Sequence, residues 1–439
     1  MKIANLYNIY LNHRTISTDS RNIPLNSIFF ALKGENFNGN PFAKSAVDKG
    51  AAFVVIDQEA YMHPGDERFI LVHDVLKTLQ ELANFHRKQL KIPVVAITGS
   101  NGKTTTKELT TKVLSKKYKT LATKGNLNNH IGVPLTVLSI DNSIEVAIIE
   151  MGANHQGEIK MLCEIAEPTH GLITNVGMAH LEGFGGFEGV KKGKGELYQF
   201  LGLHEGVAFV NYDNVHLKNM IAGHLHIKDI IGYGSGEYTD CKGSLSEMQP
   251  FLKANLSYKK DRFQKEYIAS TKLIGKYNLE NIIAAACIGD YFDVGHDLIS
   301  EAIADYSPDN SRSQVIQKGS NTIYMDAYNA NPTSMTAAII NFSEAAGNHK
   351  IVMLGDMHEL GTESEEAHRE IIALLKKQSF DKIILVGNYF SAPANEIDCL
   401  HFKTSAEAAS TIKLQKINNS LILIKGSRGQ KMELLLDAI

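Results

Sequence analysis

The sequence predicts an α/β protein with three domains, and three observations support this prediction. The chain has 439 residues, which at about 150 residues per domain favours three domains over two. A short β-rich run at 94–98 leads through glycines into a helical stretch from Lys103, which is the order of a strand, a phosphate-binding loop and a helix. Beyond about Ser307, strand and helix patterns alternate, as in a parallel sheet covered by helices.

The first block, residues 1–91, predicts a small α/β domain. Apolar runs at 27–32, 51–56 and 69–72 have the composition of strands, and a segment rich in glycine and asparagine interrupts them at 34–41. Apolar residues then recur at helical spacing over 75–90. Pro93 follows this helix, so we expect the domain to end there.

The second and third blocks, residues 92–306 and 307–439, predict a central parallel-sheet domain of the P-loop type and a Rossmann-like C-terminal domain. Central strands are expected at 94–98, 146–150, 171–175 and 207–211, with a helix at 279–291. The polar stretch 233–267 is expected to form a peripheral hairpin region. C-terminal strands are expected at 322–326, 350–354, 382–386 and 420–424.

Composition excludes several classes of protein. Hydrophobic residues make up 44% of the chain and charged residues 21%, which is enough apolar material for real cores. The net charge of −3, without a basic stripe, argues against nucleic acid as a partner. The four cysteines are far apart in sequence, which favours reduced thiols in the cytoplasm over a zinc site. No signal peptide or membrane span is expected, and we expect a monomer.

The strongest motif is Thr98-Gly-Ser-Asn-Gly-Lys-Thr-Thr105. Its glycines let backbone N–H groups close on phosphate oxygens, Lys103 adds a positive charge, and the Thr104 hydroxyl is suited to Mg²⁺. The predicted nucleotide loop consists of Gly99, Ser100, Asn101, Gly102, Lys103, Thr104 and Thr105. Ile97 occupies the place of the usual first glycine, and the alternative is a glycine turn with an exposed lysine. The strand before and the helix after the motif favour the phosphate loop.

Polar residues at other strand ends are candidates for metal binding. Glu150 ends a predicted strand, where a carboxylate can complete the Mg²⁺ shell, although a solvated glutamate is the alternative. His180 follows the strand at 171–175, although a lone histidine is usually an ordinary hydrogen-bonded residue. Lys191, Lys192 and Lys194 follow a glycine-rich run and also fit a solvated helix start.

Further candidates precede helices. Asn281 can reach a nucleobase edge or serve simply as a helix-entry residue. Asp326 and Asn329 lie after a predicted parallel strand, at the sheet edge where ligands bind in open α/β sheets. Asn331 fits either this edge or a helix N-cap with Pro332 at the first helical position.

Taken together, these motifs resemble the Mur ligases of peptidoglycan synthesis, most closely their D-alanyl-D-alanine-adding branch. The motifs that carry this resemblance are Ser17–Arg21, Ala31–Phe37, Thr98–Thr105, Gly125–Pro134, Glu150–Asn154, Asn175–Gly185, Tyr328–Pro332 and Leu354–Gly361. The resemblance implies ATP and Mg²⁺ as cofactors, with UDP-N-acetylmuramoyl-tripeptide and D-alanyl-D-alanine as substrates. The tripeptide carboxylate would attack the γ-phosphate of ATP, and the dipeptide amine would then displace phosphate from the acyl phosphate.

The resemblance also implies roles for individual residues. Lys103 would neutralise phosphates, Thr104 and Glu150 would hold one Mg²⁺, and His180 would hold a second with a carbamylated Lys194. Asn281, Arg312 and Asp326 would contact the nucleotide. The implied substrate-binding residues are Ser20, Arg21 and Asn36 in the uridine-binding segment, together with Asn126, Asn128, Asn129 and Asn329. The outer domains would close over the central one, because substrates held on separate domains must meet.

Two departures from the family pattern weaken local assignments. Tyr277 stands where the family commonly has histidine, and Arg312 lacks a preceding glycine. The rival hypotheses are a sister ligase, such as another Mur enzyme or a folylpolyglutamate synthase, and a nucleotide-dependent switch without ligase activity. The Asp19-Ser20-Arg21 segment favours a UDP-sugar substrate over folate.

Overall fold

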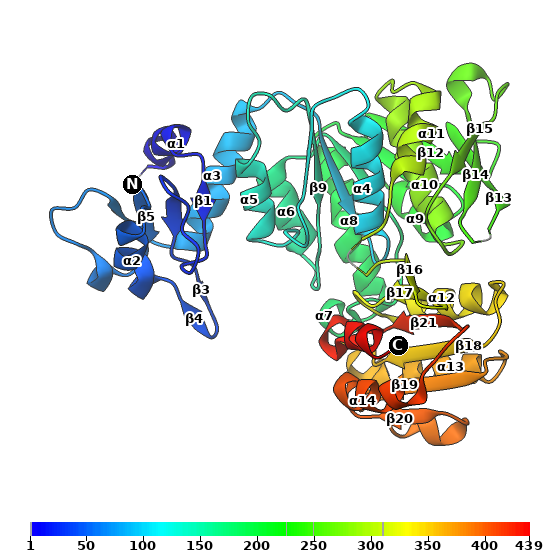
Figure 1. Ribbon diagram of the computed structural model, residues 1–439. Helices are drawn as coiled ribbons and strands as arrows, with labels where there is room; N and C mark the ends of the chain where they lie inside the picture. The colour runs from blue at the N-terminus through cyan, green and yellow to red at the C-terminus, as the bar shows by residue number, and fades with distance from the viewer. Residues whose placement is uncertain (1, 225, 249, 310) are drawn as a thin grey trace.

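The computed structural model describes residues 2–224, 226–248, 250–309 and 311–439, and its strands form three main sheets. Figure 1 shows them in sequence order, with the N-terminal part (blue) at one end and the C-terminal part (orange and red) packed against the central part. The α/β fold class predicted from the sequence is confirmed. The expected boundaries near Lys91 and Ser307 stay a prediction.

The N-terminal sheet has four parallel strands in the order β1-β2-β5-β6. They are β1 (Ile16–Ser17), β2 (Ile28–Phe30), β5 (Phe53–Ile56) and β6 (Phe69–Leu71), flanked by α1 (Ile3–Asn12) and α2 (Ala43–Asp48). A small hairpin of β3 (Lys33–Gly34) and β4 (Phe37–Asn38) projects from this sheet. The three strands predicted from the sequence are confirmed with shorter bounds, and β1 was not predicted.

Helix α3 (Val75–Gln89) connects the N-terminal sheet to the central part. It packs against α5 (Gly132–Leu138) and α6 (Glu158–Ala166), so it shares a core with the central domain. The buried Arg87 donates from Nε to the carbonyl of Ala166 at 2.9 Å and from Nη2 to that of Glu167 at 3.0 Å. A cation that binds the carbonyls at the end of α6 also complements the helix dipole.

The central sheet has nine strands in the order β15-β14-β13-β12-β11-β10-β7-β9-β8. Strands β8 to β13 pair in parallel, and the last two pairings are antiparallel. The strands are β7 (Val94–Thr98), β8 (Thr120–Ala122), β9 (Val146–Glu150), β10 (His170–Ile173), β11 (Val207–Asn211), β12 (Asp229–Gly234), β13 (Cys241–Glu247), β14 (Lys253–Tyr258) and β15 (Tyr267–Ser270). The hairpin region expected over 233–267 is therefore confirmed as an antiparallel extension of the sheet.

Helices cover both faces of the central sheet. Alternate residues of one strand point to opposite sides, so Val94 and Ala96 pack with α5, α6 and α8 (Phe187–Leu203), whereas Val95 and Ile97 face the other layer. That layer contains α4 (Lys103–Leu114), α10 (Asn278–Tyr291) and α11 (His296–Asp305). Short helices α7 (Leu181–Phe184) and α9 (Val215–Ile221) complete the domain.

The C-terminal sheet has the order β16-β17-β21-β18-β19-β20, parallel except for the edge strand β16. The strands are β16 (Gln314–Lys318), β17 (Asn321–Asp326), β18 (Lys350–Gly355), β19 (Lys382–Val386), β20 (Leu400–Phe402) and β21 (Leu421–Lys425). Helices α12 (Pro332–Glu344), α13 (Ser364–Leu375) and α14 (Ser405–Gln415) connect them. The four predicted strands are confirmed, whereas β16 and β20 were missed. Among the described residues, no helix is long and apolar enough to span a membrane.

Candidate active site

The loop between β7 and α4 has the backbone of a phosphate cradle. Gly99 and Gly102 have φ values of 142° and 79°, which side chains rarely tolerate. A Cβ at Gly102 would also lie 2.5 Å from Oδ1 of Asn281, and one at Gly99 would lie 2.0 Å from Oγ1 of Thr174. Both positions therefore require glycine, and the loop leaves its N–H groups at the start of α4, where an anion is favoured.

Lys103 is the first residue of α4 and folds back over this loop. Its Nζ donates to the carbonyls of Gly99 at 2.6 Å and Ser100 at 3.2 Å. Burial lowers its pKa to about 8, the positive charge of Arg312 adds to this effect, and Glu150 opposes it. The ammonium group is therefore held among carbonyls at the place where phosphates would supply a stronger partner.

Glu150 ends β9 beside Ile97 in the β7–β9 pairing, so it lies next to the start of the loop. The residue is 1% exposed, and its Oε1 accepts a hydrogen bond from Nδ2 of Asn128 at 2.7 Å. Its Oε2 is buried and has no hydrogen-bond partner in the described part of the chain. A buried, unpartnered carboxylate oxygen is costly, so this atom fits the coordination of a cation.

These groups open into a cavity of about 660 Å³ between the central and C-terminal domains. The predicted residues that line it are Ser100, Asn101, Gly102, Lys103, Thr104, Thr105, Asn128, Asn129, Glu150, His180, Asn281, Arg312, Asp326 and Asn329. Most of the predicted loop, metal and nucleotide residues thus meet at one place, although they come from distant parts of the sequence. No group of three or more His, Cys, Asp or Glu side chains suited to a metal occurs among the described residues.

Asn281 lies on α10 against the phosphate loop. Its Oδ1 accepts a hydrogen bond from Oγ1 of Thr106 at 3.0 Å, and its Nδ2 donates to Oδ1 of Asn278 at 2.8 Å. It is 6% exposed and touches Gly102. In this structure Asn281 therefore supports the phosphate loop. It lies in the first turn of α10, because the helix begins three residues earlier at Asn278.

The C-terminal domain contributes the opposite wall. The guanidinium of Arg312 stacks 3.5 Å from the ring centre of Tyr328, and Nε of Arg312 is buried without a partner among the described residues. Asp326 accepts a hydrogen bond from Nζ of the buried Lys425 at 2.6 Å. Asp326 is thus held by an ion pair at the end of β17, as expected for the ligand edge of a parallel sheet.

His180 and Lys194 occupy different surroundings. His180 has a left-handed backbone with φ of 55°, and its Nδ1 lies close to Oε2 of Glu359 from the C-terminal domain, which lowers the pKa of Glu359. Lys194 is 1% exposed and donates to the carbonyl of Ala153 at 3.1 Å, behind the cavity wall. Burial, together with the positive charge of Lys103, shifts the pKa of Lys194 well below its usual value.

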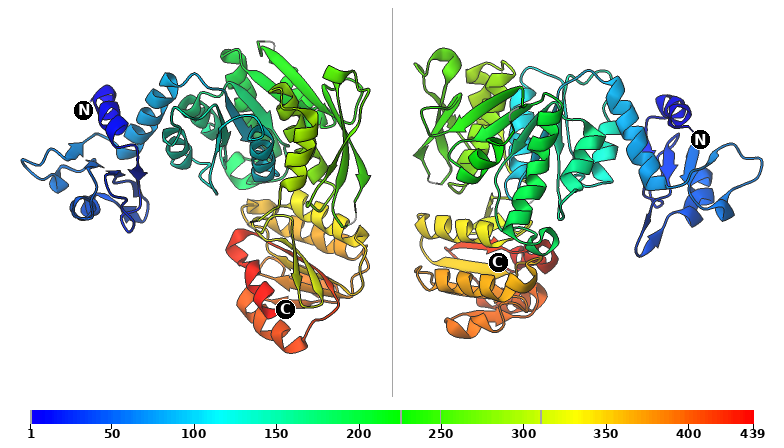
Figure 2. Two further views of the ribbon diagram at one scale, coloured as in Figure 1. Left: turned by 45° about the horizontal axis from the view of Figure 1, so that its top comes forward. Right: turned by 180° about the vertical axis from the view of Figure 1, so that it is seen from behind.

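Several predicted residues lie outside the cavity lining. Gly99 and Asn126 belong to its surrounding loops, whereas Ser20, Arg21 and Asn36 lie on the N-terminal domain. The Arg21 side chain is 88% exposed and pairs with Asp19, which lowers the pKa of Asp19 to about 2. Figure 2 shows the N-terminal domain extended away from the C-terminal domain in both views, and none of the described residues that line the cavity belongs to the N-terminal domain.

Tyr328, Glu359 and Lys425 were given no role in the site from the sequence, whereas Asn331 was considered there either as a residue of the ligand edge or as a helix N-cap. Tyr328, Asn331, Glu359 and Lys425 each make one of the contacts that join the site or its two domains. Tyr328 and Asn331 follow β17, and Lys425 is the last residue of β21, so their positions at strand ends were an available signal. The partner of Glu359 could not be foreseen, because residues 180 and 359 lie far apart in the chain.

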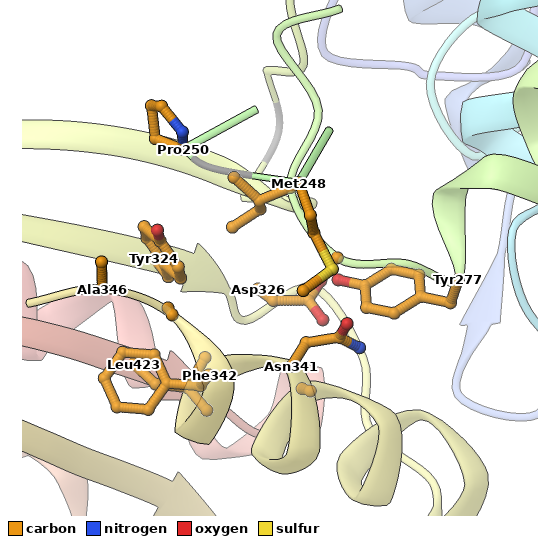
Figure 3. A pocket seen from close by; sticks show the side chains of 13 residues that line it. Met248, Pro250, Tyr277, Tyr324, Asp326, Asn341, Phe342, Ala346 and Leu423 are labelled. Atoms are coloured by element: carbon orange, nitrogen blue, oxygen red, sulfur yellow. The ribbon is translucent and has the colours of Figure 1, made fainter. Parts of the chain in front are cut away.

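A second cavity, of about 320 Å³, adjoins the first between the hairpin extension and α12. Figure 3 shows Tyr277, Asn341 and Asp326 together at one end of this cavity, with Tyr324 and Phe342 further along it. Tyr277 and Asp326 line both cavities. The Tyr277 hydroxyl is 2.9 Å from Oγ of Ser313, so this side chain links the central domain to the segment that enters the C-terminal domain.

Comparison with known proteins agrees with this architecture. Three family models match the chain: the Mur ligase family catalytic domain at 13–87, the Mur ligase middle domain at 97–289 and the Mur ligase glutamate ligase domain at 311–428. The UDP-N-acetylmuramoyl-tripeptide–D-alanyl-D-alanine ligase of Bacillus subtilis is 34% identical over 95% of this chain and 91% of its own length. The Escherichia coli enzyme of that name is 34% identical over 97% of this chain and 93% of its own length.

Solved structures resemble the whole chain as well. MurF from Acinetobacter baumannii has a TM-score of 0.86 at 31% identity and covers 96% of this chain and 92% of its own. MurF ligase from Thermotoga maritima, solved in complex with ADP, has a TM-score of 0.84 at 26% identity, covering 98% of this chain and 97% of its own. With the phosphate loop, the buried carboxylate and the three sheets in place, the chain belongs to the Mur ligase family.

Proposed function

We propose that this chain is an ATP-dependent, ADP-forming ligase that joins D-alanyl-D-alanine to the terminal carboxyl of UDP-N-acetylmuramoyl-tripeptide. The observation that carries the proposal is the cavity in which the Lys103 ammonium, the loop N–H groups and the unpartnered oxygen of Glu150 meet. Relatives that bear the name of this activity match almost the full length of the chain, which supports the choice of substrates.

The reaction has two steps. A carboxylate oxygen of the tripeptide attacks the γ-phosphorus, and the bond to the ADP oxygen breaks. The dipeptide amine then attacks the acyl carbon and loses a proton, and the carbon–oxygen bond to phosphate breaks. The first step brings two anions together, so Lys103 and the loop must neutralise charge; loss of one preorganised donor costs about 100- to 1000-fold in such sites.

A magnesium ion fits the loop side of the cavity. Thr104, which is 4% exposed and lines the cavity, would hold it together with Glu150, and Asn128 fixes the other oxygen of that carboxylate. Mg²⁺ usually keeps several waters and binds one or two carboxylates plus phosphates, which agrees with the absence of a larger acidic cluster in the described residues. When bound, the ion would neutralise phosphate charge.

A second cation would be held by His180 and by Lys194 as its carbamate. The support is chemical: burial lowers the pKa of Lys194 and so favours the neutral amine, which is the form that can add carbon dioxide, lose a proton and become an anion. Lys194→Ala should abolish ligation and recover part of it with a small carboxylic acid. Full activity of Lys194→Ala would contradict this assignment.

Substrates are assigned to the remaining surfaces. We assign the nucleobase and ribose of ATP to Asn281, Arg312 and Asp326. The tripeptide substrate is assigned to Ser20, Arg21 and Asn36 at its uridine end and to Asn126, Asn128, Asn129 and Asn329 near the reaction centre. The N-terminal domain would then have to approach the cavity. The described cysteines are free, which fits a reducing compartment such as the cytoplasm.

Phosphate release is the direct test. It should require ATP, UDP-N-acetylmuramoyl-tripeptide and D-alanyl-D-alanine together, and mass spectrometry should detect the extended peptide. Equal ATP hydrolysis without either acceptor would favour a nucleotide-dependent switch and contradict the ligase.

A further inference from the structure

Asn331 joins the C-terminal domain to the phosphate loop by a direct hydrogen bond. Its Nδ2 donates to Oδ1 of Asn101 at 2.7 Å, across 230 residues of sequence. Asn101 lies at the centre of the loop between Gly99 and Gly102, and both side chains line the nucleotide cavity. Asn331 is 7% exposed, so water competes little for this bond.

Asn101, the acceptor of this hydrogen bond, is also held in place by its neighbours. The N–H of Asn101 donates to Oδ1 of Asn175 at 3.0 Å, and its carbonyl accepts from Oγ1 of Thr174 at 2.6 Å and from Nδ2 of Asn175 at 3.1 Å. These bonds fix the Asn101 backbone to the end of β10. The position of the Asn101 side chain is then set from the C-terminal domain by Asn331.

Asn331 also caps a helix, and this role must be distinguished from its hydrogen bond to Asn101. It is the N-cap of α12: its Oδ1 accepts from the N–H of Ser334 at 2.9 Å, and the Ser334 hydroxyl accepts from the Asn331 N–H at 3.1 Å. The amide oxygen thus serves the helix and the amide nitrogen serves the loop. Serine caps helices about as well as asparagine, but its short side chain with one hydroxyl cannot do both.

The same helix end touches a second loop of the site. Oγ1 of Thr333 accepts from the N–H of Met178 at 3.3 Å, two residues before His180. The first turn of α12 therefore contacts both the phosphate loop and the loop that leads to His180. An undocked C-terminal domain would lose both contacts at once.

We infer that Asn331 is a positioning residue that couples docking of the C-terminal domain to the conformation of the phosphate loop. Because coupling between two equilibria is reciprocal, nucleotide in the loop favours the docked domain, and the docked domain favours nucleotide binding. This inference rests on the proposed function only in that the cavity binds ADP or ATP.

Asn331→Ser tests the coupling, because it keeps the cap and removes the bond to Asn101. ADP affinity is measured by calorimetry, and docking by energy transfer between dyes on Leu203→Cys and Leu414→Cys, which are 74% and 84% exposed, in a Cys399→Ser background. We expect ADP to raise the transfer efficiency in the parent chain. In Asn331→Ser, ADP should bind about three- to tenfold more weakly, the value of one hydrogen bond, and should produce a smaller change in transfer.

Thr404→Ala is the matched control, because it removes the N-cap of α14 in the same domain, far from the site. It should lower the melting temperature while leaving ADP affinity and the transfer change intact, whereas Asn331→Ser should melt like the parent. Parent-like affinity and transfer in Asn331→Ser, no ADP-dependent transfer in the parent, or equal loss of affinity in Thr404→Ala would each overturn the coupling. Failure of the parent chain to bind any ADP would instead contradict the proposed function.

Discussion

The lowered pKa of Lys103 predicts that nucleotide affinity depends on pH in a range where an ordinary lysine would not titrate. With a pKa of about 8 in the free protein, about 90% of Lys103 is charged at pH 7 and about 10% at pH 9. If only the charged form attracts phosphate, the apparent Kd for ADP should rise about tenfold between these pH values. A lysine with its usual pKa near 10.4 would change the Kd by less than about 10% over the same range.

ADP should bind more weakly at higher pH because of the way in which burial acts on Lys103. Burial lowers the pKa by disfavouring the ammonium form, and bound phosphate restores it, so binding takes up a proton above pH 8. Calorimetry in buffers of different ionisation enthalpy measures both the Kd and the proton uptake. Lys103→Arg is the control, because its guanidinium stays charged throughout, and its affinity should not fall with pH. A Kd for the parent chain that is constant from pH 7 to 9 would refute the reasoning.

Three other substitutions test separate contacts. Glu150→Gln should lower the rate of ligation, measured as ADP release, at least about 100-fold. Calorimetry should show unchanged affinity for the UDP substrate, and a loss of that affinity would contradict the assignment of Glu150 to the metal and phosphates. Asp326→Asn leaves the buried Lys425 without its anion and should lower the free energy of unfolding, measured with denaturant, by about 3 kcal/mol. The double variant Asp326→Asn with Lys425→Met should recover part of this free energy, because it also removes the buried charge. Arg87→Ala should destabilise the junction at α6 by about 3 kcal/mol, and an unchanged unfolding midpoint would show that these bonds contribute nothing.

Local patterns explain how much of the fold could be predicted. Strand β7, the glycine loop and α4 are adjacent in sequence, so apolar residues, glycines and Lys103 specify them together. The inner strands β9, β18 and β19 are continuous apolar runs. Strands β8, β16 and β20 lie at sheet edges and were missed, because short or partly exposed edge strands lack that pattern.

The site was less predictable because its contacts are distant in sequence. Nothing near Asn331 indicates a bond to Asn101, and nothing near Asp326 names Lys425 as its partner. The position of Arg21 depends on how the N-terminal domain is oriented, which no local pattern encodes, and here Arg21 is exposed and pairs with Asp19. Types of residue at strand ends could therefore be predicted, whereas their pairings required the folded chain.

Isotope transfer tests the central claim most directly. The terminal carboxylate of UDP-N-acetylmuramoyl-tripeptide is labelled with ¹⁸O, the full reaction with ATP and D-alanyl-D-alanine is run, and the released phosphate is examined by ³¹P NMR. Attack of that carboxylate on the γ-phosphorus predicts one ¹⁸O atom in each phosphate formed from labelled carboxylate oxygen. Amide formation with no ¹⁸O in the phosphate would contradict activation of the carboxyl group by ATP in this cavity.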